Sequence, residues 1–412
     1  MREPIENILA DFRNLIVPAS THWNHPRFHA WFSVSASSPG ILAEALAAAL
    51  NVNGMLWKSS PVPVELEQTV LDWLRQWLQL PGEFTGVIYD TASTSTMHAL
   101  AAARDFVDPE SRTRGSRGDL IVYTSAQAHT SVEKGAIALG FGQDNVPKIA
   151  VDGDFRMCTK ALSTAIASDL TAGKRPCCIV PTVGTTSTTS IDDVRAAVDI
   201  AATCGAWVHV DGAYGACAAI VPELRHILNG SESAHSLVVN PHKWFFTAFD
   251  LSVLYTSRPD ILRRAFSLSA EYLRTAQDDK AVNFMDYGVP LGRRFRSLKF
   301  WFVMRYFGRL RMAQTIRDHI GYAQEFANRI KTDPDFELAA PVTLSLVCFR
   351  YRGTNDQNLE LMNRINSSGV AFLSHTVLLG NFVIRLAYGN LRTTARDVDI
   401  VWRCLQRCKT GL

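Results

Sequence analysis

The chain has 412 residues, which is long enough for one large domain and a smaller one. A hydrophobic fraction of 47% and a charged fraction of 20% are typical of an ordinary soluble globular protein. The 42 basic and 39 acidic residues leave a net charge of +3, which is too small to indicate a nucleic-acid or membrane partner.

The N-terminal region carries no pattern of a targeting or membrane segment. The sequence MREPIENILADFRNL contains acids and lacks a continuous apolar core, which argues against a secretory signal or a transit peptide. The apolar stretch ILAEALAAALNVNGMLW is interrupted by Glu44 and by asparagines, so we expect no membrane span. The 8 cysteines lack CxxC spacing, as is typical of reduced thiols. We therefore expect a cytoplasmic protein.

His22, His25 and His29 form the only cluster that resembles a metal site. Pro26 breaks the helix that would align the imidazoles, and no carboxylate or cysteine completes a ligand set. We predict that the protein binds no metal.

A repeating pattern over about residues 118–257 predicts the core domain. Short runs rich in β-branched residues, typical of buried parallel strands, alternate with amphipathic helical patterns. The predicted strands are DLIVYTS, VPKIAV, CCIVPTV, AWVHVDG, SLVVN and LSVLYTS. The predicted fold class is therefore α/β, with a mostly parallel central sheet that helices cover on both faces.

A second pattern begins near Asp333, after a long helical stretch that starts at Arg296. The segments VTLSLVCFRY and NFVIRLAYG alternate like half-exposed strands, with helical segments between and after them. We therefore predict three parts: an N-terminal segment over 1–60, a large α/β domain over 61–330 and a small α+β domain over 331–412.

Two ionisable residues follow predicted strands, at the edge of the sheet where ligands bind in α/β proteins. Asp211 ends AWVHVDG, and its simplest interpretation is a turn aspartate. Lys243 lies in NPHKW between apolar residues. Apolar surroundings lower the pKa of a lysine amine, and the neutral amine can attack an aldehyde. A single lysine, however, more often extends its amine into solvent. Together they match what pyridoxal phosphate requires: a lysine for its aldehyde and an acid for its ring nitrogen.

Hydroxyl residues at the start of a predicted helix suit a phosphate group. In DTASTSTMHALAAAR, Thr91, Ser93 and Thr94 lead into a strong helix, whose free N–H groups and dipole favour an anion. The same residues also suit a helix that is merely well capped. Asn240 and His242, beside the lysine, add further donors.

Two more predicted strand ends carry polar side chains. His129 follows DLIVYTS and is placed to stack on a flat ring, although a lone histidine is more often structural. Thr185 and Thr186 follow CCIVPTV and are also able to contact a ring. The order of these groups along successive strand ends is more specific than any one of them.

These motifs resemble those of the group II pyridoxal-phosphate decarboxylases, specifically the aromatic-L-amino-acid decarboxylases. The resemblance extends from about residue 7 to the C-terminus. It is carried by THWNHPRFHAWF, QAHTSVEKGA, VGTTSTTSIDD, WVHVDGAYG, PELRHILNG, NPHKW, EYLRT, PLGRRFRSLKFWFVMRYFG and LVCFR. It implies the fold-type I, aminotransferase-like architecture, pyridoxal 5'-phosphate as cofactor, and a homodimer with shared active sites.

The resemblance also implies roles for single residues. Lys243 binds the cofactor covalently, Asp211 pairs with its ring nitrogen, and His129 stacks on its ring. Tyr272, on a loop, protonates the substrate carbon. The other implied cofactor contacts are Thr91, Ala92, Ser93, Thr186, Ala213, Asn240 and His242. The implied substrate pocket comprises Trp23, Trp31, Phe32, Val34 and Gly292, together with Asn53 and Met55 supplied by the partner subunit.

Three features depart from the family pattern. The chain begins inside the region of N-terminal helices that interlock the dimer, so we expect a smaller interface. Asp90 stands where a glycine often precedes the phosphate hydroxyls. Val34 replaces a hydroxyl residue near the substrate carboxylate.

The predicted function is decarboxylation of aromatic L-amino acids of the tryptophan, tyrosine, phenylalanine, DOPA or 5-hydroxytryptophan type. The nearest alternative is an aldehyde synthase, in which phenylalanine usually replaces the tyrosine at 272. Histidine or glutamate decarboxylation is a further alternative, against which Gly292 weighs.

A different class of alternative is a relative that keeps the fold without catalysis. Such a relative would be expected to lose Lys243, Asp211 or His129. The basic run GRRFR recurs in the family, so we expect no nucleic-acid partner.

Overall fold

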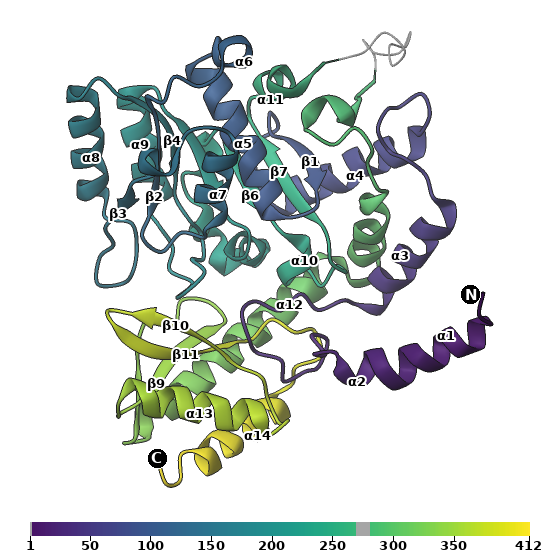
Figure 1. Ribbon diagram of the computed structural model, residues 1–412, viewed down its shortest axis with the longest axis vertical. Coiled ribbons are helices and arrows are strands. Elements are labelled where there is room, and N and C mark those ends of the chain that lie inside the picture. Colours follow the sequence, from purple (N-terminus) through teal and green to yellow (C-terminus); the bar gives the residue numbers. More distant parts are fainter. Residues whose placement is uncertain (1, 269–280) are drawn as a thin grey trace.

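The computed structural model describes residues 2–268 and 281–412, and its largest element is a seven-stranded sheet of order β1-β7-β6-β5-β4-β2-β3 (Figure 1). The strands are β1 (Thr85–Tyr89), β2 (Leu120–Ser125), β3 (Lys148–Ile149), β4 (Arg175–Val180), β5 (Trp207–Asp211), β6 (Ser236–Val239) and β7 (Ser252–Thr256). Strand β7 is antiparallel to β1 and β6, and the remaining pairs are parallel. The prediction of a mostly parallel sheet is confirmed.

Helices cover both faces of this sheet. They are α4 (Pro61–Leu78), α5 (Ala92–Val107), α6 (Ser111–Arg114), α7 (Ser131–Ala138), α8 (Thr159–Thr171), α9 (Val194–Cys204), α10 (Pro241–Trp244) and α11 (Pro259–Phe266). The connections through α5 and α7 move along the sheet in one direction, and those through α8 and α9 return in the other. Because such crossovers are right-handed, α5 and α7 lie on one face and α8 and α9 on the other.

The central strands are buried because both faces are covered. Every residue of β2, β5 and β6 is buried, which explains their continuous runs of β-branched side chains. Short 3₁₀ segments complete the domain at Gln143–Asn145, Gly215–Ile220, Pro222–Leu228, Ser231–Ser233 and Phe284–Tyr287. The carboxyl ends of the parallel strands meet at one edge, and the residues that follow them are brought together there.

A four-stranded antiparallel sheet of order β10-β11-β9-β8 forms the second layered unit. Its elements are β8 (Phe336–Leu338), β9 (Leu346–Tyr351), α13 (Asn355–Ser367), β10 (Ser374–Leu378), β11 (Asn381–Ala387) and α14 (Ala395–Cys408). Helix α13 packs on the sheet and on α14, and a separate hydrophobic cluster lies between them. The prediction of a half-exposed strand is wrong for β11, because all of Val383–Ala387 are buried. Ile384 and Leu386 lie in this second cluster, whereas Val383 and Ala387 lie in the core cluster of the large domain, so both faces of the strand are covered.

Helix α12 (Arg296–Thr332) links the two sheets. It is interrupted at Gly308, whose φ of +66° is a conformation that favours glycine. Its first part packs on α3 (Ser38–Leu50) and α4, and its last part packs on β8 and β9. The long predicted helix therefore consists of two helices joined at Gly308, and the second cluster draws residues from its last part, beginning at Ala323.

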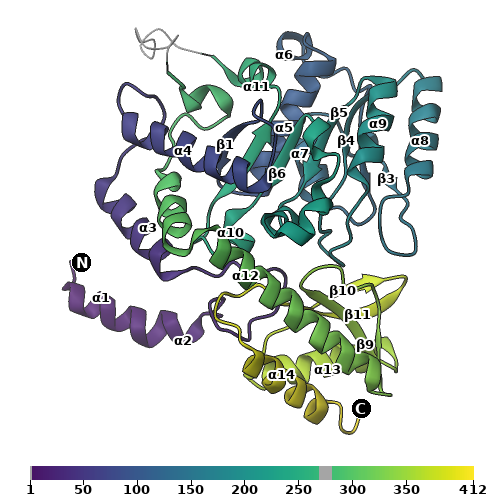
Figure 2. The same ribbon diagram turned by 180° about the vertical axis from the view of Figure 1, so that it is seen from behind.

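The N-terminal segment extends away from the body of the chain (Figures 1 and 2). Helix α1 (Ile5–Asp11), a π-helical segment (Phe12–Ile16) and α2 (Val17–Ala19) contain no buried residue. Within residues 2–268 and 281–412, no helix is both long and apolar enough to cross a membrane. The predicted division of the chain into three parts, with boundaries at residues 60 and 330, stays a prediction.

Candidate active site

A cavity of about 160 Å³ lies at the carboxyl edge of the large sheet. All ten residues predicted to contact a cofactor line it, although they come from five different stretches of the chain. The lining residues are Phe32, Thr91, Ala92, Ser93, His129, Ser131, Thr182, Gly184, Thr186, Asp211, Ala213, Tyr214, Asn240, His242 and Lys243.

Lys243 lies on the short helix α10, directly after β6. Its Nζ is 5.6 Å from the ring centre of Phe32, and its neighbour Trp244 is fully buried. Trp244 fixes this helix, because its indole N–H donates to His319 Nδ1 (3.0 Å) and its ring stacks on Tyr214 (4.5 Å). Burial lowers the pKa of Lys243, and nearby Asp211 only partly offsets the effect. A larger fraction of this amine is therefore neutral and nucleophilic than for a surface lysine.

Asp211 ends β5 and is 5% exposed. Its backbone is fixed by β4, because Asp211 N–H donates to Pro181 O and Val183 N–H donates to Asp211 O, both at 2.9 Å. One carboxylate oxygen accepts the N–H of Ala213 (3.1 Å). The described residues give the other oxygen no partner, so it is available to a ligand in the cavity that Asp211 lines.

The start of α5 forms the anion-binding end of the cavity. Thr91 is the N-cap residue, and its Oγ1 accepts the N–H of Thr94 (3.5 Å). The N–H groups of Ala92 and Ser93 have no carbonyl partner within the helix, because they precede its first hydrogen-bonded turn. Hydroxyls, free N–H groups and the helix dipole all favour a phosphate here.

His242 adds a neutral donor to this end. The N–H of Leu251 donates to its Nδ1 (3.0 Å), so the ring proton is on Nε2. Burial, and then the charge of Lys243, lower the pKa of His242 to about 3. The imidazole is therefore neutral at physiological pH and offers Nε2–H to a ligand.

His129 and Thr186 come from the loops after β2 and β4. The N–H of Ser131 donates to His129 Nδ1 (3.1 Å), so the proton is again on Nε2. Burial lowers the pKa of His129, and Lys243 lowers it further. Thr185, the other threonine considered, does not line the cavity, because its Oγ1 accepts the N–H of Ser190 (3.0 Å).

These residues fit pyridoxal 5'-phosphate. Two buried polar atoms on the wall, Asn240 Oδ1 and Thr182 Oγ1, have no hydrogen-bond partner among the described residues, as is expected where a polar ligand completes the site. A lysine amine with a lowered pKa, a strand-end carboxylate and an anion-binding helix end suit the aldehyde, the ring nitrogen and the phosphate, respectively.

Only one of the seven predicted substrate residues, Phe32, lines the cavity, where it stacks on Tyr214 (3.8 Å). Trp23 and Trp31 stack on each other (5.2 Å), and Trp31 N–H donates to Ser374 Oγ (3.0 Å). These two tryptophans and Val34 are not in the cavity wall.

The remaining three substrate candidates form a separate cluster. Asn53 Oδ1 accepts the N–H of Arg293 (2.8 Å), Asn53 Nδ2 lies 3.5 Å from Met55 Sδ, and a β-carbon at Gly292 would lie 3.8 Å from Asn53 Nδ2. A single chain does not bring this cluster to Lys243. The assignment of Asn53 and Met55 to the partner's site stays a prediction. Tyr272 lies outside the described residues.

Sequence reasoning missed Arg385, a buried cation beside the cavity. Arg385 is 3% exposed and lies on β11, with its Cζ 5.5 Å from the ring centre of Phe32. Its guanidinium donates to Thr186 O, Ser187 O and Ser374 Oγ, and no carboxylate among the described residues pairs with it. An arginine within the apolar run of NFVIRLAYG was the available signal, because arginine is rarely buried unless it is paired.

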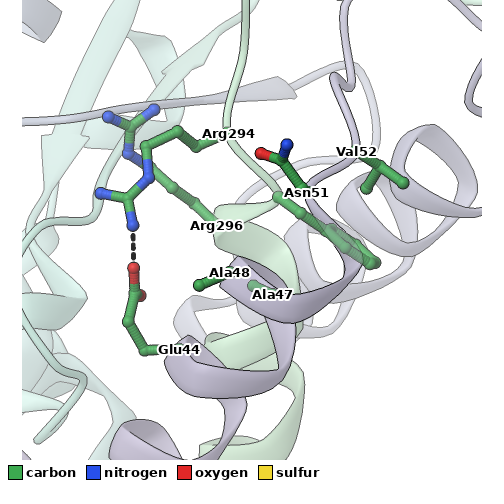
Figure 3. A pocket seen from close by; sticks show the side chains of 8 residues that line it. Glu44, Ala47, Ala48, Asn51, Val52, Arg294 and Arg296 are labelled. Atoms are coloured by element: carbon green, nitrogen blue, oxygen red, sulfur yellow. Dashed lines mark hydrogen bonds and ion pairs between the residues drawn. The ribbon is translucent and has the colours of Figure 1, made fainter. Parts of the chain in front are cut away.

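A second pocket, of about 220 Å³, lies between α3 and the start of α12 (Figure 3). Glu44 pairs with Arg294 there, as the dashed line in Figure 3 marks, and also with Lys299 (2.7 Å). Arg296 pairs with Asp250 (2.8 Å). Because these charges already neutralise one another, this pocket is a weaker candidate than the cavity at Lys243.

Comparison with known proteins places the chain among well-described relatives. Residues 1–352 match the family model of the pyridoxal-dependent decarboxylase conserved domain. The chain is 39% identical to tryptophan decarboxylase 2 of Oryza sativa subsp. japonica (98% of this chain, 85% of the relative) and 38% identical to phenylacetaldehyde synthase of Arabidopsis thaliana (98% and 86%). The crystal structure of Oryza sativa TDC with PLP and tryptamine is similar with a TM-score of 0.97 and 35% identity, covering 100% of this chain and 89% of that one. The predicted fold-type I architecture is confirmed.

Proposed function

Because this chain belongs to the pyridoxal-dependent decarboxylase family, we propose that it converts aromatic L-amino acids to aromatic amines and carbon dioxide. It is a carboxy-lyase that depends on pyridoxal 5'-phosphate, as the resemblance in its motifs predicted. The observation that carries the proposal is that Lys243 and Asp211 line the same cavity, together with the aromatic side chain of Phe32.

Six of the fifteen residues that line the cavity have a proposed role in this reaction. When bound, the cofactor supplies an electron sink for the electron pair that remains as carbon dioxide leaves. Lys243 would hold its aldehyde covalently. Asp211 keeps the ring nitrogen protonated, because a buried carboxylate stabilises the positive charge beside it. His129 would contact the ring, and Thr91, Ser93 and His242 would hold the phosphate.

Arg385 is our candidate for attracting the substrate carboxylate. It is a desolvated cation without an acidic partner among the described residues, and it contacts the same Phe32 ring as Lys243. Burial lowers the pKa of Arg385, yet an arginine stays charged in proteins. The face of Phe32 next to it suits an aromatic side chain by stacking.

A panel of substrates tests this proposal. We expect purified protein, saturated with pyridoxal 5'-phosphate, to release equal amounts of amine and carbon dioxide from at least one of tryptophan, tyrosine, phenylalanine, DOPA and 5-hydroxytryptophan. Consumption of oxygen, with release of aldehyde, ammonia and hydrogen peroxide in place of the amine and with carbon dioxide still formed, would identify an aldehyde synthase. A relative of similar identity, a phenylacetaldehyde synthase, makes this the main alternative. Turnover of histidine or glutamate alone would also contradict the proposal.

Tyr272 decides between amine and aldehyde in this proposal. Replacing Tyr272 by phenylalanine removes the hydroxyl that protonates the substrate carbon, so we expect the ratio of amine to aldehyde to fall by about tenfold or more. Product analysis by chromatography, with a peroxide assay, measures this ratio. Tyr306→Phe, at a surface position in α12, is the matched control and should leave the ratio unchanged. A Tyr272→Phe protein that forms only amine at the normal rate would refute this role.

We further propose that the enzyme is a cytoplasmic homodimer. The 8 cysteines are all free thiols, as suits a reducing compartment. The segment from α1 to α2 exposes six large apolar side chains, namely Ile5, Ile8, Leu9, Phe12, Leu15 and Ile16. Apolar surface of this extent is typical of a protein interface. In this proposal, the cluster of Asn53, Met55 and Gly292 contributes to the active site of the partner subunit. Activity would therefore require the dimer.

A double substitution on this segment tests the dimer. We expect Ile8→Asp combined with Phe12→Asp to weaken self-association at least about tenfold, because two charges would be buried at the interface. Analytical ultracentrifugation measures the change, and activity should fall in parallel. Leu379→Asp, at a residue 88% exposed between β10 and β11, is the control and should remain a dimer. A double variant that stays fully dimeric would contradict the proposed interface.

A further inference from the structure

A carboxylate lies directly beside the phosphate end of the cavity. Asp90 connects β1 to α5, and its Oδ1 accepts the N–H of Thr91 (2.6 Å) and lies 3.4 Å from Thr91 Oγ1. Thr91 lines the cavity and caps α5. The acid is half-buried, so solvent only partly screens its charge.

Among the residues that the structure describes, no lysine or arginine forms an ion pair with Asp90, and His242 is neutral because burial lowers its pKa to about 3. The phosphate would therefore be held by hydroxyls and N–H groups alone. Asp90 also occupies the N–H of Thr91, which removes one donor from the set.

From this geometry we propose that Asp90 weakens the phosphate subsite by charge repulsion, so that the cofactor exchanges more readily than it would over an uncharged residue. The inference rests on the proposed function, because it requires pyridoxal 5'-phosphate in the cavity at Lys243. Two like charges in a partly dehydrated site repel each other, whereas a neutral side chain at the same position would not.

Two substitutions separate the charge of Asp90 from its hydrogen bond. Asp90→Asn keeps an acceptor for the N–H of Thr91 and removes the charge, whereas Asp90→Gly removes both. Titration of apo-protein with pyridoxal 5'-phosphate, followed by cofactor absorbance, gives each Kd. We expect Asp90→Asn to lower this Kd about tenfold at low salt, and the difference to shrink in 1 M salt because ions screen the repulsion.

Pyridoxal, which lacks the phosphate, is the matched ligand. Its Kd should be the same for wild-type protein and Asp90→Asn, because the repulsion acts on the phosphate alone. Asp193→Asn is the matched protein control, since Asp193 caps α9 by accepting the N–H of Ala196 (3.0 Å) and does not line the cavity. It should leave both constants unchanged.

An unchanged or higher Kd of Asp90→Asn for pyridoxal 5'-phosphate would overturn the inference. So would an equal gain for pyridoxal, or a loss confined to Asp90→Gly, because Asp90 would then only hold Thr91 in place. Failure of the proposed function gives a different result, in which wild-type protein binds neither ligand at Lys243.

Discussion

Replacing Lys243 by arginine is expected to abolish covalent cofactor binding and to lower the decarboxylation rate roughly a thousandfold or more. Arginine keeps a positive charge at the position, but its guanidinium stays protonated and cannot bond to an aldehyde. The visible absorbance of the bound cofactor should therefore disappear, even if the cofactor remains in the cavity through its phosphate.

Lys299→Arg is the matched control for this variant. Lys299 is 1% exposed and pairs with Glu44 (2.7 Å), so it is a buried lysine that does not line the cavity at Lys243. Arginine can form the same ion pair, and the protein should keep its visible absorbance and its rate. Circular dichroism checks that both variants fold. A Lys243→Arg protein that keeps the absorbance and the activity would remove Lys243 from the mechanism.

Replacing Asp211 by asparagine is expected to lower kcat by about a hundredfold or more while the cofactor still attaches to Lys243. The amide can accept the N–H of Ala213 as the carboxylate does, but it carries no charge to keep the ring nitrogen protonated. The rate of product release and the cofactor absorbance, measured on the same sample, separate loss of chemistry from loss of binding.

The variant Asp211→Glu separates the effect of the negative charge from the effect of the side-chain length. Glutamate restores the charge at a shifted position, so it should recover part of the rate that asparagine loses. Equal rates for Asp211→Asn and wild-type protein would show that the charge is not needed. Equal loss in both variants would show that the charge acts only from the position of the Asp211 carboxylate, because asparagine already keeps the side-chain length of aspartate.

The residues at the carboxyl edge of the large sheet were largely predictable, because parallel strands all end at the same edge. Thr91, His129, Thr186, Asp211 and Lys243 are far apart in the sequence, yet each follows a strand of the same sheet. Identifying the buried runs was therefore enough to predict that His129, Thr186, Asp211 and Lys243 converge. Strand β1, which precedes Thr91, was not among the predicted strands, and Thr91 was inferred from the start of the helix that follows it. The antiparallel direction of β7 was not predictable in this way, since a buried run has the same composition in either direction.

Other parts of the site depend on contacts that no local pattern encodes. Arg385 lies beside the cavity only because the small sheet packs against the loop after β4, where Arg385 donates to Thr186 O and Ser187 O. Asn53 and Gly292 lie together but are not in the wall of the cavity at Lys243. Strand β10 was missed because its central residues are exposed or half-buried and lack an apolar run.

The most direct test of the account is to locate the lysine that binds the cofactor. Protein saturated with pyridoxal 5'-phosphate is treated with sodium borohydride, digested and analysed by mass spectrometry. We predict one stable pyridoxyl modification, on the peptide that contains Lys243. Modification of a different lysine, or none in protein that is folded and saturated, would contradict the account.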